Sequence, residues 1–180
     1  LRLPPPPPLA PAATHRQGYK MKNEDRDAFF RGQRLEGGIR TAVEAWFANR
    51  DAAKDQYGPI ASWDTSEITN MRCLFISKRN FNDDISRWNT SGVTEMQYMF
   101  YLAAAFNQPI GSWDTSRVTT MQSMFRQATS FGQSIGEWNV GRITNMQSMF
   151  YAANALSSCN KAQIHASFSA RGPVWPYISA

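Results

Sequence analysis

Cysteine and histidine are scarce in this chain of 180 residues, which contains two of each. Neither His15 nor His165 has a partner at the spacing of a metal-binding or catalytic motif. The chain also lacks a CxxC pair, a phosphate-binding loop and a nucleophile elbow around any serine. We therefore expect a protein that is not an enzyme and that holds no metal ion or cofactor. An active site assembled across several parts of the chain is the alternative.

Long apolar runs are also missing. No stretch approaches the roughly 18 apolar residues of a membrane span, and the first residues show no signal-peptide pattern. The net charge is +5, but residues 60–159 carry seven Lys or Arg and seven Asp or Glu. A nucleic-acid-binding protein concentrates positive charge on its folded surface. We expect no transmembrane segment and no nucleic-acid partner.

An internal repeat fills the middle of the chain. Tryptophan recurs every 25 residues, and the units 60–84, 85–109, 110–134 and 135–159 align without insertions. Each unit opens with Ile, follows Trp with Asp or Asn, and places Met eight and Phe twelve residues after Trp. A unit of this length cannot bury its own apolar face, so neighbouring units must stack. The four tryptophans are Trp63, Trp88, Trp113 and Trp138.

Two spacings within each unit predict its local structure. In the third unit, Ile110, Trp113, Thr115 and Val118 follow the LxxLxL pattern of a short parallel strand. The following apolar residues, at spacings of three, three, one and three, are typical of a short helix. Thr-x-x-Gln boxes predict where these helices begin, at Thr94–Gln97, Thr119–Gln122 and Thr144–Gln147.

The fold class that follows is α/β. We expect a right-handed, leucine-rich-repeat-like solenoid of four coils, each a short parallel strand plus a short helix, capped at both ends. The Trp, Met and Phe columns should form its core. The polar column after Trp should accept backbone N–H groups in a turn, with a cation site as the alternative. Its members are Asp64, Asn89, Asp114 and Asn139.

The flanks predict a leader and two caps. Residues 1–33 are proline-rich and should be disordered. Residues 34–59 should form an N-terminal helical cap that begins at a Thr41-x-x-Glu44 box, and residues 160–180 a C-terminal cap that begins at Asn160. Cys73 and Cys159 should be buried and unpaired. Three stacked rungs separate them by about 15 Å, and a disulfide needs Cα atoms within about 7 Å.

The segment FNQPIGSWDTSRVTTMQSMF resembles the repeat of BspA-type leucine-rich-repeat surface proteins. The likeness returns in the other three units and, with the flanking segments, covers residues 41–177. The resemblance implies a right-handed α/β solenoid, a cell-surface or secreted location and a role in recognition or adhesion. It implies no catalytic residues.

These observations favour a recognition module that binds a protein, or less readily a glycan, through one face. The contact residues should be those that vary while the core columns stay regular. We expect a monomer or weak self-association. Alternatives are a structural spacer or self-associating matrix component, and an intracellular scaffold that uses the proline-rich leader. The expected contact residues are Glu67, Lys78, Arg79, Arg117, Arg126 and Arg142.

Overall fold

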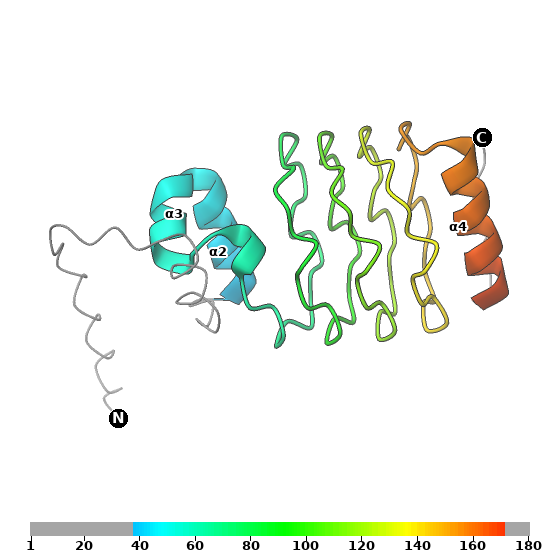
Figure 1. Cartoon of the computed structure of the whole chain (residues 1–180), viewed down its shortest axis with the longest axis horizontal. Helices are drawn as coiled ribbons and strands as arrows, with labels where there is room; N and C mark the ends of the chain where they lie inside the picture. The colour runs from blue at the N-terminus through cyan, green and yellow to red at the C-terminus, as the bar shows by residue number, and fades with distance from the viewer. Residues whose placement is uncertain (1–37, 172–180) are drawn as a thin grey trace, which may run out of the picture.

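The computed structural model describes residues 38–171. Two helices open this part of the chain, α2 (Gly38–Ala48) and α3 (Arg50–Tyr57), followed by the short 3-10 helix η1 (Ile60–Ser62). The four repeat units then form a row of stacked coils, and α4 (Ser158–Arg171) stands at the far end (Figure 1). The predicted leader, residues 1–33, lies outside the described residues.

The predicted solenoid of strand-and-helix coils is wrong. Residues 38–171 contain no β-strand, and residues 63–157 contain no helix. Each coil is instead a chain of tight turns joined by extended residues. Neighbouring coils share isolated parallel bridges, which link Asn70 to Glu95, Glu95 to Thr120, and Thr120 to Asn145.

Hydrogen bonds between coils explain why the helix does not form. In the first coil, every second N–H of one arm donates to a carbonyl of the next coil at 2.7–3.0 Å; the donors are Met71, Cys73, Phe75 and Ser77. Between them, the N–H groups of Leu74 and Ile76 donate three residues back within the coil at 3.2 Å, and that of Arg72 donates to the Asn70 side chain at 2.9 Å. An α-helix would have used all of these donors internally. The period of three among the apolar residues therefore reflects successive turns.

The turns place residues other than glycine in the left-handed region. Eight such residues, two in each coil, have φ between 51° and 62°. This conformation costs on the order of 1 kcal/mol or more for a residue with a Cβ. The surrounding coil-to-coil hydrogen bonds offset that cost. The residues are Cys73, Ser77, Tyr98, Leu102, Ser123, Gln127, Ser148 and Ala152.

The predicted Thr-x-x-Gln capping boxes are also wrong. Thr94 donates its hydroxyl to the carbonyl of Thr69 in the preceding coil at 3.1 Å. Thr119 and Thr144 repeat this bond, each to the threonine 25 residues earlier. The column of threonines therefore joins one coil to the next.

The core follows the predicted columns. The four Trp side chains are 1–5% exposed, and each indole N–H donates to a backbone carbonyl of the preceding segment at 2.8–3.3 Å. In coil two, Phe100 stacks on Phe106 at 3.9 Å between ring centroids, and Phe100 lies 5.5 Å from Phe75 and from Phe125 in the coils on either side. The prediction that these columns form the core is confirmed. Met146 and Phe150 of the last coil are only partly buried.

Helices α2 and α3 cover the first coil. Trp46 meets Trp63 edge-on at 5.8 Å, and Phe47 meets Phe81 at the same distance. Asp83 accepts the indole N–H of Trp46 at 3.0 Å and pairs with Arg50 at 2.7 Å. The predicted capping box at Thr41 is wrong, because α2 already begins at Gly38.

Helix α4 closes the other end. Its apolar side chains Ile164 and Phe168 are each 1% exposed. Asn160 is not the predicted cap, because it lies inside the helix; its N–H donates to the Ser157 hydroxyl at 3.1 Å. The Asn160 side chain donates to the carbonyl of Gly132, three residues before the last coil begins at Ile135.

The two cysteines are free, as predicted, but they are not both buried. Cys73 is half-buried and Cys159 is exposed. Cys73 also lies in a turn of the first coil, not in a helix, because its backbone adopts a φ of 58°.

Candidate interaction surface

Each coil presents one side chain at the tip of a tight turn. In the first coil this turn runs from Phe75 to Lys78, closed by the Lys78 N–H donating to the Phe75 carbonyl at 3.1 Å. Its central residues are Ile76 and Ser77; Ser77 has a φ of 59°, and Ile76, the second residue of the turn, is 39% exposed. The other coils repeat the turn. We call the four tip residues the tip column: Ile76, Tyr101, Arg126 and Tyr151.

Backbone hydrogen bonds hold the tip column in register. The carbonyls of Tyr101, Arg126 and Tyr151 each accept an N–H from the preceding coil, at 2.7–2.9 Å. Ile76 and Tyr151 are the large apolar side chains of residues 38–171 that remain exposed, at 39% and 59%. The column therefore places apolar and aromatic groups on a surface that is otherwise mostly polar.

Arg126 has an unusual environment in this column. Its guanidinium carbon lies 4.4 Å from the centre of the Tyr151 ring. It forms no ion pair within the described part of the chain, and its Nε is buried without a hydrogen-bond acceptor there. A cation held by a ring face and not neutralised by a carboxylate can still attract a negatively charged group.

The six predicted contact residues fall into two separate columns. Glu67, Arg117 and Arg142 are exposed in the turn that follows the buried Thr or Val column. Arg126 belongs to the tip column, Lys78 is the last residue of that column's first turn, and Arg79 follows the turn. The ammonium of Lys78 lies 4.4 Å from the centre of the Phe47 ring of α2. In the first coil, residues 68–75 separate Glu67 from Ile76 of the tip column.

Sequence reasoning missed the aromatic members of the tip column. Tyr101 and Tyr151 open the variable segments YLAAA and YAANA, and Ile76 opens ISKRN. Tyr98 adds a second ring, edge-on to Tyr101 at 6.2 Å. The variation between units marks this position in the sequence, but the charged residues that vary with it do not include its apolar and aromatic members.

The polar column after Trp has the structural role that was predicted. Asp114 accepts the N–H of Ser116 at 2.9 Å, and Asp64, Asn89 and Asn139 accept equivalent bonds at 3.0–3.1 Å. The hydroxyl of Ser116, followed by its N–H, lowers the pKa of Asp114. Within residues 38–171, no group of three His, Cys, Asp or Glu could hold a metal ion. These carboxylates therefore stabilise turns.

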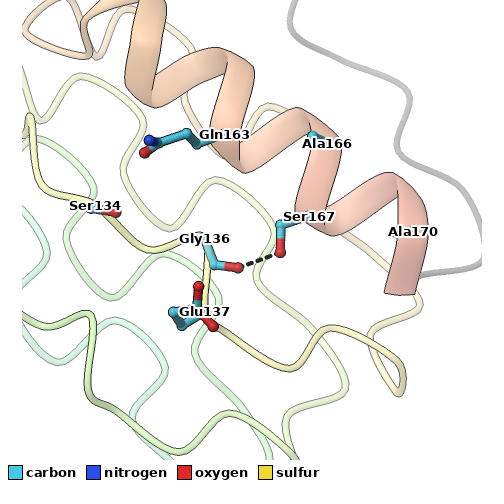
Figure 2. Close-up of a pocket in the computed structure, with 7 residues that line it drawn as sticks. All are labelled: Ser134, Gly136, Glu137, Gln163, Ala166, Ser167 and Ala170. Atoms are coloured by element: carbon cyan, nitrogen blue, oxygen red, sulfur yellow. Dashed lines mark hydrogen bonds between the residues drawn. The ribbon is translucent and has the colours of Figure 1, made fainter.

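A groove of about 600 Å³ lies between the last coil and α4. Figure 2 shows the Ser167 hydroxyl donating to the carbonyl of Gly136 across it. Glu137 is the one ionisable side chain among the lining residues. We attribute the groove to the shape of α4, because a straight helix packs less closely against the last coil than another coil would. Its lining is Ser134, Gly136, Glu137, Gln163, Ala166, Ser167 and Ala170.

Residues 41–162 match the family described as "Mycoplasma protein of unknown function, DUF285". The match covers more than half of the chain, which therefore belongs to this family. No curated protein and no solved structure matches the chain. None of the helices in the described part combines the length and the apolarity that crossing a membrane requires.

Proposed function

We propose that the stack of coils is a non-catalytic recognition or adhesion module that binds a protein through the tip column. The observation that supports this most directly is the row of Ile76, Tyr101, Arg126 and Tyr151, repeated once per coil and held by backbone hydrogen bonds. Tyrosine and arginine are the residues most enriched where binding energy concentrates in protein interfaces. A rigid backbone also reduces the ordering entropy that binding costs.

A protein partner fits this column better than a glycan. The column combines an aliphatic end at Ile76, two tyrosine rings and a cation that forms no ion pair within residues 38–171. Acidic and apolar side chains side by side on a partner protein would meet both halves of that surface. A neutral sugar would use the rings but would leave Arg126 without its favoured carboxylate. Glycan binding therefore stays the second candidate.

The test is a binding comparison between two double variants. The purified chain is applied to arrays of immobilised proteins and of immobilised polysaccharides. Tyr101→Ser with Tyr151→Ser should abolish the binding seen with the unchanged chain, because it removes both rings. Arg117→Ala with Arg142→Ala removes two exposed residues of the other column and should leave binding unchanged. Equal binding by both variants, or no binding by the unchanged chain, would overturn the proposal.

A surface location rests on the resemblance to BspA-type proteins, and protease treatment of intact source cells tests it. We expect the repeat region to be lost from intact cells, since an adhesion module must be accessible outside. Protection until lysis would favour the scaffold alternative instead. Removal of residues 1–33 would then have to weaken an interaction if the leader takes part.

A structural or self-associating role is favoured by one observation, the incomplete cover of the last coil, where Met146 and Phe150 are only partly buried. Light scattering over a range of concentrations tests it. A size that grows with concentration would support self-association, and a constant monomer would exclude it.

A further inference from the structure

The turn after Trp joins the two arms of each coil, the arm that contains Trp and the second arm, whose alternate N–H groups bond to the next coil. The polar column in this turn is exposed in every coil, at Asp64, Asn89, Asp114 and Asn139. Two residues later, the first three coils carry Ser and the last carries Gly141. Asn89 is therefore the one member of the column that combines a side-chain amide with a hydroxyl two residues later.

The Asn89 side chain uses its oxygen in the turn and leaves its nitrogen unused. Its Oδ1 accepts the N–H of Ser91 at 3.1 Å and the hydroxyl of Ser91 at 2.7 Å. Within residues 38–171, its Nδ2 donates to no acceptor. The buried Thr90 between them donates its hydroxyl to the carbonyl of Asp114 at 3.0 Å, which fixes the turn on the stack. An amide nitrogen is thus held on an exposed residue of a fixed turn.

The stability of the turn does not explain the amide. An N–H and a hydroxyl are both donors, and a carboxylate accepts from donors more strongly than an amide oxygen does. Asp64 and Asp114 fill the same position in the coils on either side and accept the N–H of the following serine at 2.9–3.0 Å. An Asp at position 89 would therefore serve the turn better than Asn89 does.

The surface beside Asn89 is also open. Three residues after the polar column, the other coils carry the exposed side chains of Glu67, Arg117 and Arg142. The second coil carries Gly92 at this position. Its turn therefore has no long side chain next to Asn89 that would crowd a bulky group attached there.

We propose that Asn89 is an acceptor for an N-linked glycan, attached at Nδ2. Asn89, Thr90 and Ser91 form the pattern Asn-x-Ser/Thr, with a middle residue other than proline, on which such glycans are placed in exported proteins. The other asparagines of the chain lack this pattern. The inference rests on the surface or secreted location in the proposed function, because a chain that is not exported would not meet the transferase.

The transfer needs a donor of one chemical class, an oligosaccharide linked through pyrophosphate to a lipid. The Nδ2 of Asn89 forms a bond to the anomeric carbon of the first sugar, and the bond from that carbon to the pyrophosphate oxygen breaks. The pyrophosphate leaves with the bonding electron pair, and Nδ2 loses one of its two protons.

A glycan at Asn89 would leave the tip column open. In the second coil, residues 90–100 lie between Asn89 and Tyr101 of that column. The sugars would instead cover the turn around Gly92 and the neighbouring Arg117. The modification is therefore compatible with protein binding through the tip column.

Mass spectrometry of the full chain from source cells tests the proposal. After treatment with an amidase that removes N-linked glycans, we expect the chain to lose the mass of one glycan and to carry Asp in place of Asn89. An unmodified Asn89 in a chain that protease treatment places outside the cell would overturn the proposal and leave the surface location intact. Protection of the chain until lysis would overturn both.

Three variants separate the acceptor role from the role in the turn. The full chain is given a secretion signal and produced in cells that glycosylate exported proteins. Asn89→Asp keeps the acceptor that the neighbouring coils use, so it should fold unchanged but carry no glycan. Ser91→Ala should also lose the glycan, and Ser91→Thr, which keeps the hydroxyl, should retain it. No glycan on the unchanged chain, or a glycan that persists in Asn89→Asp, would overturn the assignment.

Discussion

The two ends of the stack are closed in different ways. At the N-terminal end, α2 and α3 reach both arms of the first coil, because Trp46 packs on Trp63 and Phe47 packs near Phe75 and Phe81. At the C-terminal end, the bonds from α4 reach the arm of residues 132–137. Each coil has two arms, and a terminal helix shields the coil from solvent fully only when it covers both arms.

The hydrogen bonds at the two ends show the same asymmetry. Arg40 of α2 donates to the carbonyl of Arg72 and to the side chain of Asn70, in the second arm of the first coil. In the second arm of the last coil, the N–H groups of Met146, Ser148 and Ala152 meet no acceptor within residues 38–171. The stack is thus polar along its axis, with acceptors facing α2 and donors facing the C-terminal side.

The largest effect should come from breaking the better-sealed end. Trp46→Ala removes a buried ring and its bond to Asp83, and we expect it to lower the free energy of unfolding by about 3–5 kcal/mol. Ile164→Ala at the other end should cost about 2–3 kcal/mol. Urea unfolding of both variants measures the difference. A larger loss for Ile164→Ala would show that α4, and not α2, is the more important cap.

Gly111 and Gly136 occupy the same position in the third and fourth units. Replacing each of them with alanine compares the closeness of packing between two coils with that between a coil and α4. A Cβ on Gly111 would lie 2.6 Å from the carbonyl oxygen of Ser134, the residue that leads into the next coil, whereas a Cβ on Gly136 would be 3.8 Å from the nearest atom of α4. We expect Gly111→Ala to destabilise by about 1–3 kcal/mol. Gly136→Ala should be neutral or stabilise by about 0.5 kcal/mol.

Thermal unfolding of the two alanine variants decides this comparison. Because the substitution is identical, differences in helix propensity or hydrophobicity do not enter. Equal melting temperatures would mean that the coils can move apart to admit a methyl group, and that they pack no more closely than the coil and α4 do.

A smaller effect should come from Asp83, which joins α2 and α3 to the first coil. Asp83→Asn keeps an acceptor for Trp46 but removes the charge facing Arg50. The Arg50 side chain is 51% exposed, so solvent screens the pair, and we expect a loss of about 0.5–1 kcal/mol. The loss should shrink at high salt. Asp84→Asn is the control, since Asp84 accepts from Ser86 in its own turn; an equal salt response would contradict the pairing.

The sequence allowed the repeat and its core to be predicted. Trp, Met and Phe recur at fixed positions because the same buried site recurs in each coil. The role of the polar column could also be predicted, because the Asp or Asn side chain accepts a hydrogen bond from the backbone N–H only two residues later in the sequence. Both inferences depend only on local spacing and on burial.

The backbone path could not be predicted in the same way. Met121 and Met124 are three residues apart whether they lie on a helix or in two successive turns. Their backbone donors decide between the two, and the partner of Met121 is Asn145, in another unit. Left-handed residues such as Tyr98 and Leu102 are also unexpected, because side chains with a Cβ disfavour that region. The position of the tip column depends on these turns. It could not be predicted from the sequence because the turns themselves could not.

The smallest expected effect is a pH dependence that differs between the ends. In the first coil, the pKa of Asp64 is lowered by the N–H and then the hydroxyl of Ser66, and that of Asp84 by the hydroxyl and then the N–H of Ser86. Asn139 fills the position of Asp64 in the last coil and does not titrate.

A lowered pKa in the folded state means that each carboxylate stabilises the fold above about pH 4, the range of an unfolded Asp. This contribution is lost as the pH falls through the lowered folded value. Acid should therefore weaken the turns at Asp64 and Asp84 in the first coil before it affects the turn at Asn139 in the last coil. The end that is better covered at neutral pH should be the first to lose stability. NMR titration of the Ser66 and Ser86 amides, with Gly141 as the control, measures this. If all three amides respond together, the loss is global unfolding and the two ends do not differ in their response to acid.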